Sequence, residues 1–159
     1  SASSVNFHPA YLPINRGWYP HVHSILDGSV CGVSIHKIDE NADTGPIWAQ
    51  EKVELLPTDT AKDIYVRLQK RIFEVFSKNW DSIKNGSLNP TPQNLTGGNY
   101  HKKNEIEALD HIDLEKTYTG EELINILRAR SFGDRGFAYF TKANKKIFLK
   151  LELSEESRF

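Results

Sequence analysis

The stretch VNFHPAYLPINRGWYP, residues 5–20, joins the end of a short apolar strand to three prolines, an Arg-Gly pair and several aromatic residues. Asn6 and His8 stand two positions apart in it. Residues two apart in a strand project from the same face, so the carboxamide and the imidazole are predicted to lie side by side. A simple turn would not need those groups. The stretch therefore predicts a strand that ends at a chemical site.

Regular elements are predicted directly after this stretch. Pro20 suits the first turn of a helix through HVHSILDG, where its missing N–H has no partner to lose, and Gly28 suits the end of that helix. The sequence VCGVSIHKID, residues 30–39, alternates until Lys37 and predicts a half-buried strand. A loop at 41–46 and a second strand from Ile47 to Leu55 follow.

The clearest predicted helix begins after Thr60. Thr60-x-x-Asp63 has the form of a capping box, and an apolar stripe then runs until Asn85-Gly86 ends the pattern. The stripe predicts a core-facing amphipathic helix of about 24 residues.

The main boundary is predicted beyond that helix. Residues 87–104 have the composition of a connecting segment, and Thr119-x-x-Glu122 predicts the start of a further helix. The alternating KKIFLKLEL, residues 145–153, is predicted to pair with GFAYF as a hairpin. The sequence thus predicts an α/β body to about residue 88 and then a small α+β unit.

Charge and cysteine content narrow the class of protein. The chain of 159 residues has 20 Lys and Arg against 21 Asp and Glu, so no overall field attracts nucleic acid or anionic lipid. The single Cys31 excludes an internal disulfide and favours the cytosol. No apolar run approaches the roughly 18 residues that suggest a membrane span. There is no Met, and the opening SASS is interpreted as a linker or an internal cut, so the chain is expected to be part of something longer.

Three groups suggest chemistry when taken together: Asn6, His8 and Asp43. Asp43 lies in a polar loop just before Gly45-Pro46, a pair that lets backbone approach a ligand. Acyl transfer to an amine requires a donor for the developing oxyanion, a base for the amine proton and a carboxylate to orient the base. A structural interpretation, a satisfied polar pair at a sheet edge, stays open on spacing alone.

The motifs N-F-H-P-A-Y-L-P-x-x-R-G and D-x-x-x-D-x-G-P-I, the latter at residues 39–47, together resemble the signature of the folate-dependent formyltransferases. The resemblance implies an α/β fold: a partial, Rossmann-like formyltransferase sheet in residues 1–88 and a small α+β C-terminal subdomain in residues 89–159 that binds a nucleotide sugar. It implies 10-formyltetrahydrofolate as co-substrate and no metal. The implied catalytic residues are Asn6, His8 and Asp43, and the implied folate-binding residues are Asp39, Asn41, Asp43 and Gly45.

Within that family, RGWYPHVHSILDG and the later NYHKKN and LRARSFGDRGFAYF resemble the sugar N-formyltransferases. The resemblance implies transfer of a formyl group to the amine of a dTDP-linked deoxysugar, as in lipopolysaccharide O-antigen biosynthesis, and allows a homodimer, with no nucleic-acid or membrane partner. This chain lacks the proline that the family usually has before Ala-Tyr-Phe. The implied substrate-binding residues are Arg16, Gly17, Trp18, Tyr19, Tyr100, His101, Lys102, Lys103, Arg128 and Arg130.

The basic residues also have a plainer interpretation. A diphosphate needs local cations, but lysines on loops are more often solvated surface than ligands. Arg128 and Arg130 are two apart on a predicted helix, so at most one is expected to reach a ligand. His21, His23 and His36 have no recognisable metal-ligand spacing, and no metal site is predicted.

Several expectations follow from the resemblance. Members of the family carry a further half-domain before the Asn-x-His strand, so the chain is expected to be truncated and inactive alone, or completed by another polypeptide. Because a carboxylate stabilises the charged ring, the pKa of His8 is expected above its ordinary value of about 6.5. Two alternatives remain open: a methionyl-tRNA or glycinamide-ribotide formyltransferase, and a nucleotide-sugar-binding fragment without chemistry.

Overall fold

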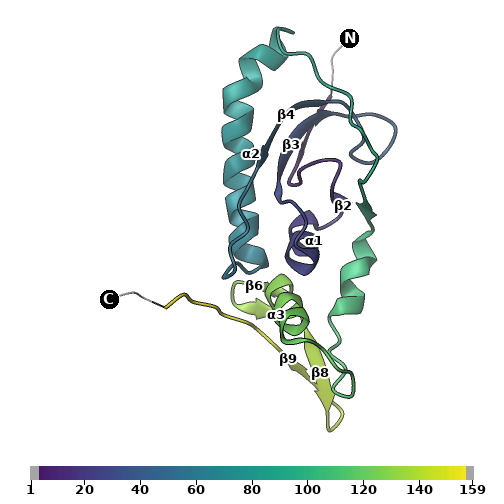
Figure 1. The fold of residues 1–159 in the computed structure, drawn as a ribbon, viewed down its shortest axis with the longest axis vertical. Coiled ribbons are helices and arrows are strands. Elements are labelled where there is room, and N and C mark those ends of the chain that lie inside the picture. The colour runs from purple at the N-terminus through teal and green to yellow at the C-terminus, as the bar shows by residue number, and fades with distance from the viewer. Residues whose placement is uncertain (1–3, 157–159) are drawn as a thin grey trace.

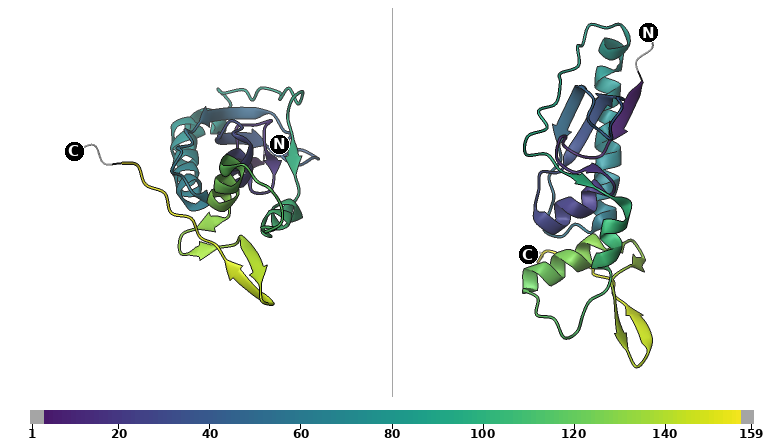
Figure 2. Two further views of the ribbon diagram at one scale, coloured as in Figure 1. Left: turned by 60° about the horizontal axis from the view of Figure 1, so that its bottom comes forward. Right: turned by 90° about the vertical axis from the view of Figure 1, so that its right-hand side faces the viewer.

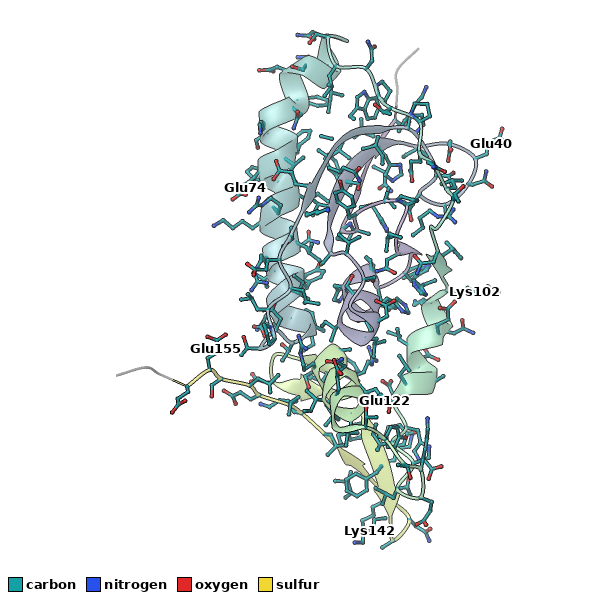
Figure 3. The ribbon with its side chains drawn as sticks, viewed as in Figure 1. Glu40, Glu74, Lys102, Glu122, Lys142 and Glu155 are labelled. Atoms are coloured by element: carbon teal, nitrogen blue, oxygen red, sulfur yellow. The ribbon has the colours of Figure 1, made fainter. Side chains whose placement is uncertain are left out.

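The computed structural model describes residues 4–156. The chain is elongated, with a small sheet and a long helix in its upper part and short helices and hairpins in its lower part (Figure 1). Charged side chains such as Glu40, Glu74 and Lys142 point outward from the ribbon (Figure 3). The predicted α/β fold class is confirmed by this arrangement.

Three antiparallel strands form the sheet that carries the first motif. They are β1 (Val5–His8), β3 (Gly32–Lys37) and β4 (Ile47–Lys52), in the order β1-β3-β4. Asn6 pairs with His36 in the register of β1 and β3. The pairing of β3 with β4 shifts between Ile35 and His36. His36, which belongs to neither motif, thus lies between Asn6 of the first motif and Ile47 of the second.

The prediction that β3 is half-buried was wrong, because the strand is buried on both faces from Gly32 to His36. Val33 and Ile35 belong to the apolar core that the long helix covers. On the other face, the Ser34 hydroxyl donates to the Ala10 carbonyl at 2.8 Å and accepts from the Leu12 N–H at 3.2 Å. The turn after β1 therefore covers the face that the alternation assigned to solvent.

The long helix α2 (Ala61–Lys84) has the predicted length and start. Its capping box is present, with the Thr60 N–H donating to the Asp63 carboxylate at 2.9 Å. Figure 2 shows α2 lying along one face of the sheet. Its apolar stripe contributes Ile64, Leu68, Ile72 and Val75 to the core. Burying such a side chain stabilises the fold by roughly 1.5–3 kcal/mol, so this stripe fixes the helix to the sheet.

Helix α1 (Pro20–Asp27) is also confirmed, with Pro20 in its first turn and Gly28 after its end at a φ of 68°. It packs against α3 (Gly120–Ala129), whose predicted cap is present because the Thr119 hydroxyl accepts from the Glu122 N–H. The two helices join the upper and lower parts of the chain.

The remaining elements are short: β2 (Arg16–Gly17), β5 (Tyr100–His101), the 3₁₀ helix η1 (Lys103–Leu109), β6 (Ser131–Phe132), β7 (Arg135–Gly136), β8 (Tyr139–Lys142) and β9 (Lys145–Phe148). The predicted hairpin is β8 with β9. Its second strand ends at Phe148 rather than at 153, because the Leu149 N–H donates to the Ala138 carbonyl and the Leu151 N–H to the Ser131 hydroxyl.

Residues 87–104 do more than connect two parts. Thr91 and Ile47 exchange two backbone hydrogen bonds of 2.8 Å, and β5 pairs in parallel with β2. The segment therefore runs back along the upper part. The division at residues 88 and 89 stays a prediction. Among residues 4–156, none of the helices combines the length and apolarity needed to cross a bilayer.

A buried histidine at the start of α1 makes stability depend on pH. His21 is 8% exposed, and its Nδ1 has no hydrogen-bond partner among the described residues. Burial, followed by the charges of His23 and Arg130, lowers the pKa of His21 to about 4. As pH falls below about 6.5, the unfolded chain binds this proton first, so stability is lost progressively down to about pH 4.

We expect His21→Phe to reduce the loss of unfolding free energy between pH 7 and pH 5 by about 2 kcal/mol. Urea denaturation at both pH values measures it. The same change at the exposed His111 is the control. An unchanged pH dependence in His21→Phe would show that His21 is not buried as a neutral ring.

Candidate active site

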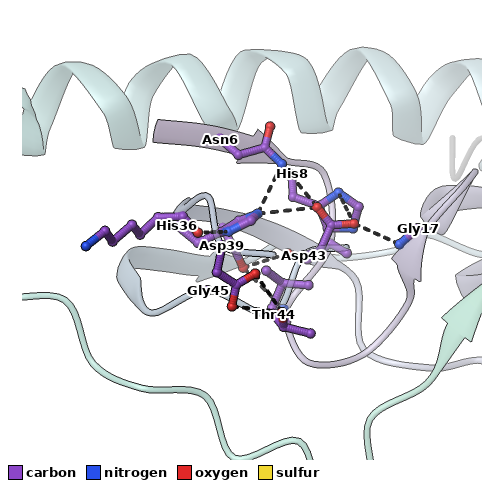
Figure 4. Close-up of polar contacts among 12 residues, drawn as sticks. Asn6, His8, Gly17, His36, Asp39, Asp43, Thr44 and Gly45 are labelled. Atoms are coloured by element: carbon purple, nitrogen blue, oxygen red, sulfur yellow. Dashed lines mark hydrogen bonds and ion pairs between the residues drawn. The ribbon is translucent and has the colours of Figure 1, made fainter. Parts of the chain in front are cut away.

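The three residues singled out by the motifs come together around one carboxylate. The Asn6 side-chain amide donates to Asp43 Oδ1 at 3.1 Å, and His8 Nδ1 lies 3.6 Å from Asp43 Oδ2 (Figure 4). Asn6 and His8 come from β1, whereas Asp43 lies in the loop between β3 and β4. The spacing of two in β1 thus places both side chains toward the same acidic group. Their chemical roles stay a prediction.

His36 is a fourth member of this cluster that the sequence analysis did not include. It is 2% exposed, and its Nε2 lies 3.1 Å from the Asn6 amide nitrogen and 3.4 Å from Asp43 Oδ1. His36 Nδ1 is 2.8 Å from the Lys37 carbonyl oxygen, so we assign the ring proton to Nδ1. Nε2 then accepts from Asn6. The sequence signal that could have identified His36 was the alternation in β3, which placed it on the same face as Ser34.

The backbone of Asp43 is held in the left-handed region, with a φ of 55°. Its Oδ2 accepts from the Gly17 N–H at 2.9 Å, so β2 also contributes to the site. Burial would raise the pKa of Asp43, but the neighbouring His36 and His8 rings and the Gly17 N–H together lower it. The carboxylate therefore enters any reaction ionised at neutral pH.

The expectation that the pKa of His8 lies above its ordinary value was wrong. His8 is 6% exposed, and burial lowers its pKa by more than the Asp43 carboxylate raises it. His8 Nε2 lies 3.0 Å from the Asn15 carbonyl oxygen, which places the proton of the neutral ring on Nε2. Nδ1 is then the nitrogen that can accept a proton, and it faces Asp43.

Asn15 connects this histidine to more distant parts of the chain. Its side chain is 1% exposed, and its Nδ2 donates to the hydroxyls of Ser24 and Ser29 at 3.1 and 2.9 Å. Its Oδ1 accepts from the Asn99 amide at 3.1 Å. The carbonyl that orients His8 therefore belongs to a residue fixed from both α1 and the connecting segment.

The residues implied in folate binding lie in the loop that carries Asp43. The Thr44 hydroxyl donates to the Asp39 carboxylate at 2.7 Å, and Asn41 is exposed. A Cβ at Gly45 would meet the Lys37 backbone, so only glycine fits there. Asp39 and Gly45 thus have roles in shaping the loop, and their role in folate binding stays a prediction.

The implied substrate residues around β2 lie close in sequence to Gly17, whose backbone N–H donates to Asp43. Trp18 is 47% exposed, and the Lys103 ammonium lies 5.1 Å from its ring centroid. Tyr19 precedes α1 in the left-handed region, and Arg16 Nε is buried without a partner among the described residues. An exposed aromatic side chain beside a lysine ammonium can receive a planar, anionic ligand.

The pairing of β5 with β2 places Tyr100 and His101 beside Arg16 and Gly17. Tyr100 is exposed. Lys102 lies directly before η1 (Figure 3), and its backbone N–H donates to Glu105. The structure thus brings the Tyr100–Lys103 segment to the same side of the site as Trp18.

His101 forms a second histidine cluster with His23 and Glu105. The rings of His23 and His101 stack, with their centroids 3.4 Å apart and an interplanar angle of 7°. His101 Nδ1 lies 2.9 Å from Glu105 Oε2. The three groups offer metal-ligand atoms within 4.8 Å of one another. A metal ion binds in the plane of an imidazole ring, and two parallel rings have no common plane. This geometry does not fit a shared ion, and the absence of a metal stays a prediction.

Arg128 and Arg130 lie in the packing of α3. Arg128 Nε donates to the Asp59 carbonyl and its Nη2 to the Leu56 carbonyl, both at 2.8 Å. Arg130 Nε and Nη2 pair with Asp110 at 2.5 and 3.1 Å. These contacts hold the helix to the chain segments around it. A role of either guanidinium in binding a diphosphate stays a prediction that no contact in this geometry supports.

Two family models match the chain. A model described as formyl transferase matches residues 1–79, and one described as the N-formyltransferase dimerization C-terminal domain matches residues 105–155. A dTDP-4-amino-4,6-dideoxyglucose formyltransferase of Mycobacterium tuberculosis is 37% identical over 153 residues. The alignment covers 96% of this chain and 65% of that relative, so the chain spans about two-thirds of the relative's length.

Solved structures show the same relationship. One described as a "likely sugar N-formyltransferase" from Mycobacterium tuberculosis has a TM-score of 0.93 and 36% identity, over 99% of this chain and 68% of the other. An N-formyltransferase from Helicobacter canadensis, solved with folinic acid and dTDP-3-aminofucose, has a TM-score of 0.77 and 29% identity, over 90% of this chain and 52% of the other.

The 3.6 Å contact between Asp43 and His8 gives a direct test of the site. We expect His8 to titrate below its ordinary value in the wild-type chain, and lower still in Asp43→Asn, because the carboxylate is the main group that raises its pKa. NMR titration of the His8 ring nitrogens measures both values. Asp81→Asn, on the exposed side of α2, is the matched control. A His8 pKa above about 6.5 in the wild type would contradict the burial argument.

Proposed function

Because the chain belongs to the formyltransferase family, we propose that it transfers a formyl group from 10-formyltetrahydrofolate to the amino group of a dTDP-linked amino-deoxysugar. The observation that carries the proposal is the convergence of Asn6 and His8 on Asp43, each within hydrogen-bond or ion-pair reach of its carboxylate. The names of the relatives support the substrate class, and the folinic acid bound to the Helicobacter canadensis relative supports a folate co-substrate.

The proton chemistry of the proposal begins with neutral His8. The sugar amine attacks the formyl carbon and forms a new C–N bond. His8 Nδ1 accepts the proton that the amine nitrogen then loses. The ring becomes positively charged 3.6 Å from Asp43 Oδ2, and the carboxylate stabilises that charge. The bond from the formyl carbon to folate N10 then breaks, and N10 takes up the proton. These reaction steps require the lowered pKa of His8, because a ring that is already protonated cannot serve as the base.

Asn6 supplies the stabilisation of the oxyanion. Its two amide hydrogens point to Asp43 Oδ1 and His36 Nε2, at 3.1 Å each. A formyl oxygen must therefore share or replace one of these acceptors as its negative charge develops. His36 is the neutral partner and the easier one to replace. Removing one such donor in other enzymes lowers turnover by about 10²–10³-fold.

The matched C-terminal domain supports a homodimer as part of the proposal. The β8–β9 hairpin exposes Ile147 at 42% and Phe148 at 61%. Exposed apolar side chains on an edge hairpin favour pairing with another chain. A cytoplasmic site of action and a role in O-antigen biosynthesis remain predictions from the sequence.

A non-catalytic module would keep the residues implied in nucleotide-sugar binding and would make no chemical use of Asn6, His8 and Asp43. We expect thermal stabilisation of this chain by dTDP, with a smaller effect of UDP. A ligand at a hundred times its dissociation constant adds about 2.7 kcal/mol to the unfolding free energy. Differential scanning fluorimetry with and without folate measures the effect. Salt-dependent stabilisation by tRNA in place of dTDP would favour the alternative of a methionyl-tRNA formyltransferase.

The catalytic assignment is tested in the longest natural form of the protein that contains this chain. We expect Asn6→Ala and His8→Ala each to lower turnover by about 100-fold or more, because each removes a group that acts in the transition state. Binding of the nucleotide sugar should remain nearly unchanged. Coupled assays with 10-formyltetrahydrofolate, together with calorimetry, measure both properties.

Asn79→Ala on α2 and His111→Ala near β8 are the matched controls, since both lie outside the cluster. Turnover close to wild type in either Asn6→Ala or His8→Ala would refute the assignment.

A further inference from the structure

The loop between β3 and β4, residues 38–46, carries Asp43 but has few contacts of its own. Residues 38–42 are exposed, and Asp43 has a φ of 55°, in the left-handed region that is uncommon for residues other than glycine, asparagine, aspartate and histidine. Within the loop, the Thr44 hydroxyl binds Asp39 at 2.7 Å. These local contacts do not reach the backbone on either side of Thr44. Asn6 and Gly17 bind the Asp43 carboxylate, but the backbone that carries it needs a further support from outside the loop.

Gln93 supplies that support from the connecting segment. Its Nε2 donates to the Asp43 carbonyl at 2.9 Å and to the Gly45 carbonyl at 2.7 Å. One carboxamide thus uses both of its hydrogens on the two peptide carbonyls that flank Thr44. The acceptors also fix the orientation of the amide, because a flipped amide would set its oxygen against both carbonyl oxygens.

The position of Gln93 is itself fixed. Two residues before it, Thr91 exchanges hydrogen bonds of 2.8 Å with Ile47 at the start of β4. Gln93 is half-buried, and its Oε1 is buried without a partner among the described residues. The side chain therefore extends from a segment that is anchored to the sheet and does not depend on the loop for its own placement.

We propose that Gln93 is a positioning residue of the active site, whose carboxamide holds the Asp43 backbone so that the carboxylate faces Asn6 and His8. The catalytic part of this inference rests on the proposed function, whereas the structural part does not. Gln93 donates to none of the side chains of the cluster and acts through the backbone carbonyls of Asp43 and Gly45. A residue in the segment predicted to be a connection thereby becomes part of the site.

The chemistry of the contact selects the variants. Gln93→Met keeps the length of the side chain and removes both donors. Gln93→Glu also keeps the length, and it sets a carboxylate against two carbonyl oxygens. Gln93→Asn keeps the carboxamide but is one methylene shorter, so it can retain only part of the contact. Gln69→Glu, on the exposed face of α2, is the matched control for the added charge.

The first measurement is independent of catalysis. NMR titration of the Asp43 carboxyl carbon in this chain should show its pKa rising toward the ordinary value in Gln93→Met and further in Gln93→Glu, with shifted Asn6 side-chain amide signals. Gln69→Glu should match the wild type. If Gln93→Glu shows no cooperative thermal transition, Gln93→Met decides the result. An Asp43 titration and Asn6 signals identical to wild type in folded Gln93→Met would overturn the proposal.

The second measurement is turnover in the longest natural form of the protein. Displacing a reacting group by about 1 Å costs on the order of 100-fold in rate, so Gln93→Met should lower kcat by roughly that factor with the KM for the amino sugar unchanged. Gln93→Asn should recover part of the loss. A raised KM with unchanged kcat would make Gln93 a binding residue and overturn the proposal. Wild-type protein without formyl transfer would refute the proposed function, and the titration would still decide the role of Gln93.

Discussion

The structure depends on the placement of one ionised carboxylate in a site that is mostly closed to water. A buried charge is costly unless hydrogen bonds and opposite charges compensate it. Asp43 receives an amide hydrogen from Asn6 and a backbone hydrogen from Gly17, and it faces two histidines. Those partners lie on β1, β2 and β3. Compensation of this charge therefore requires three separate parts of the chain to be in register.

The same requirement links the site to the packing around it. Asn6 lies opposite His36 only because β1 and β3 pair in one register, and a shift of β1 by one residue would turn Asn6 to the face opposite His36. The core between the sheet and α2 selects that register through Val33 and Ile35. Hydrophobic packing on one face of the sheet thus sets the polar geometry on the other.

Local signals predicted much of this molecule. The α2 helix, both capping boxes and the β8–β9 hairpin follow from periodicity and turn residues, and the motifs identified the three side chains that meet at Asp43. The burial of β3, the lowered pKa of His8 and the contacts of Gln93 depend on residues distant in sequence, which cover them only after folding. Arg128 shows the same limit, because its partners distant in sequence are backbone carbonyl groups, which carry no side-chain signature.

The parallel pairing of β2 with β5 has a consequence for chimaeric enzymes made from relatives of this chain. Arg16 and Gly17 receive their strand partner from Tyr100 and His101, and the Asn15 turn receives Asn99. A crossover placed directly after α2 would separate these partners and join surfaces that never evolved together. An exchange of C-terminal portions is better made beyond His101, so that the whole returning segment stays with the sheet that it fits.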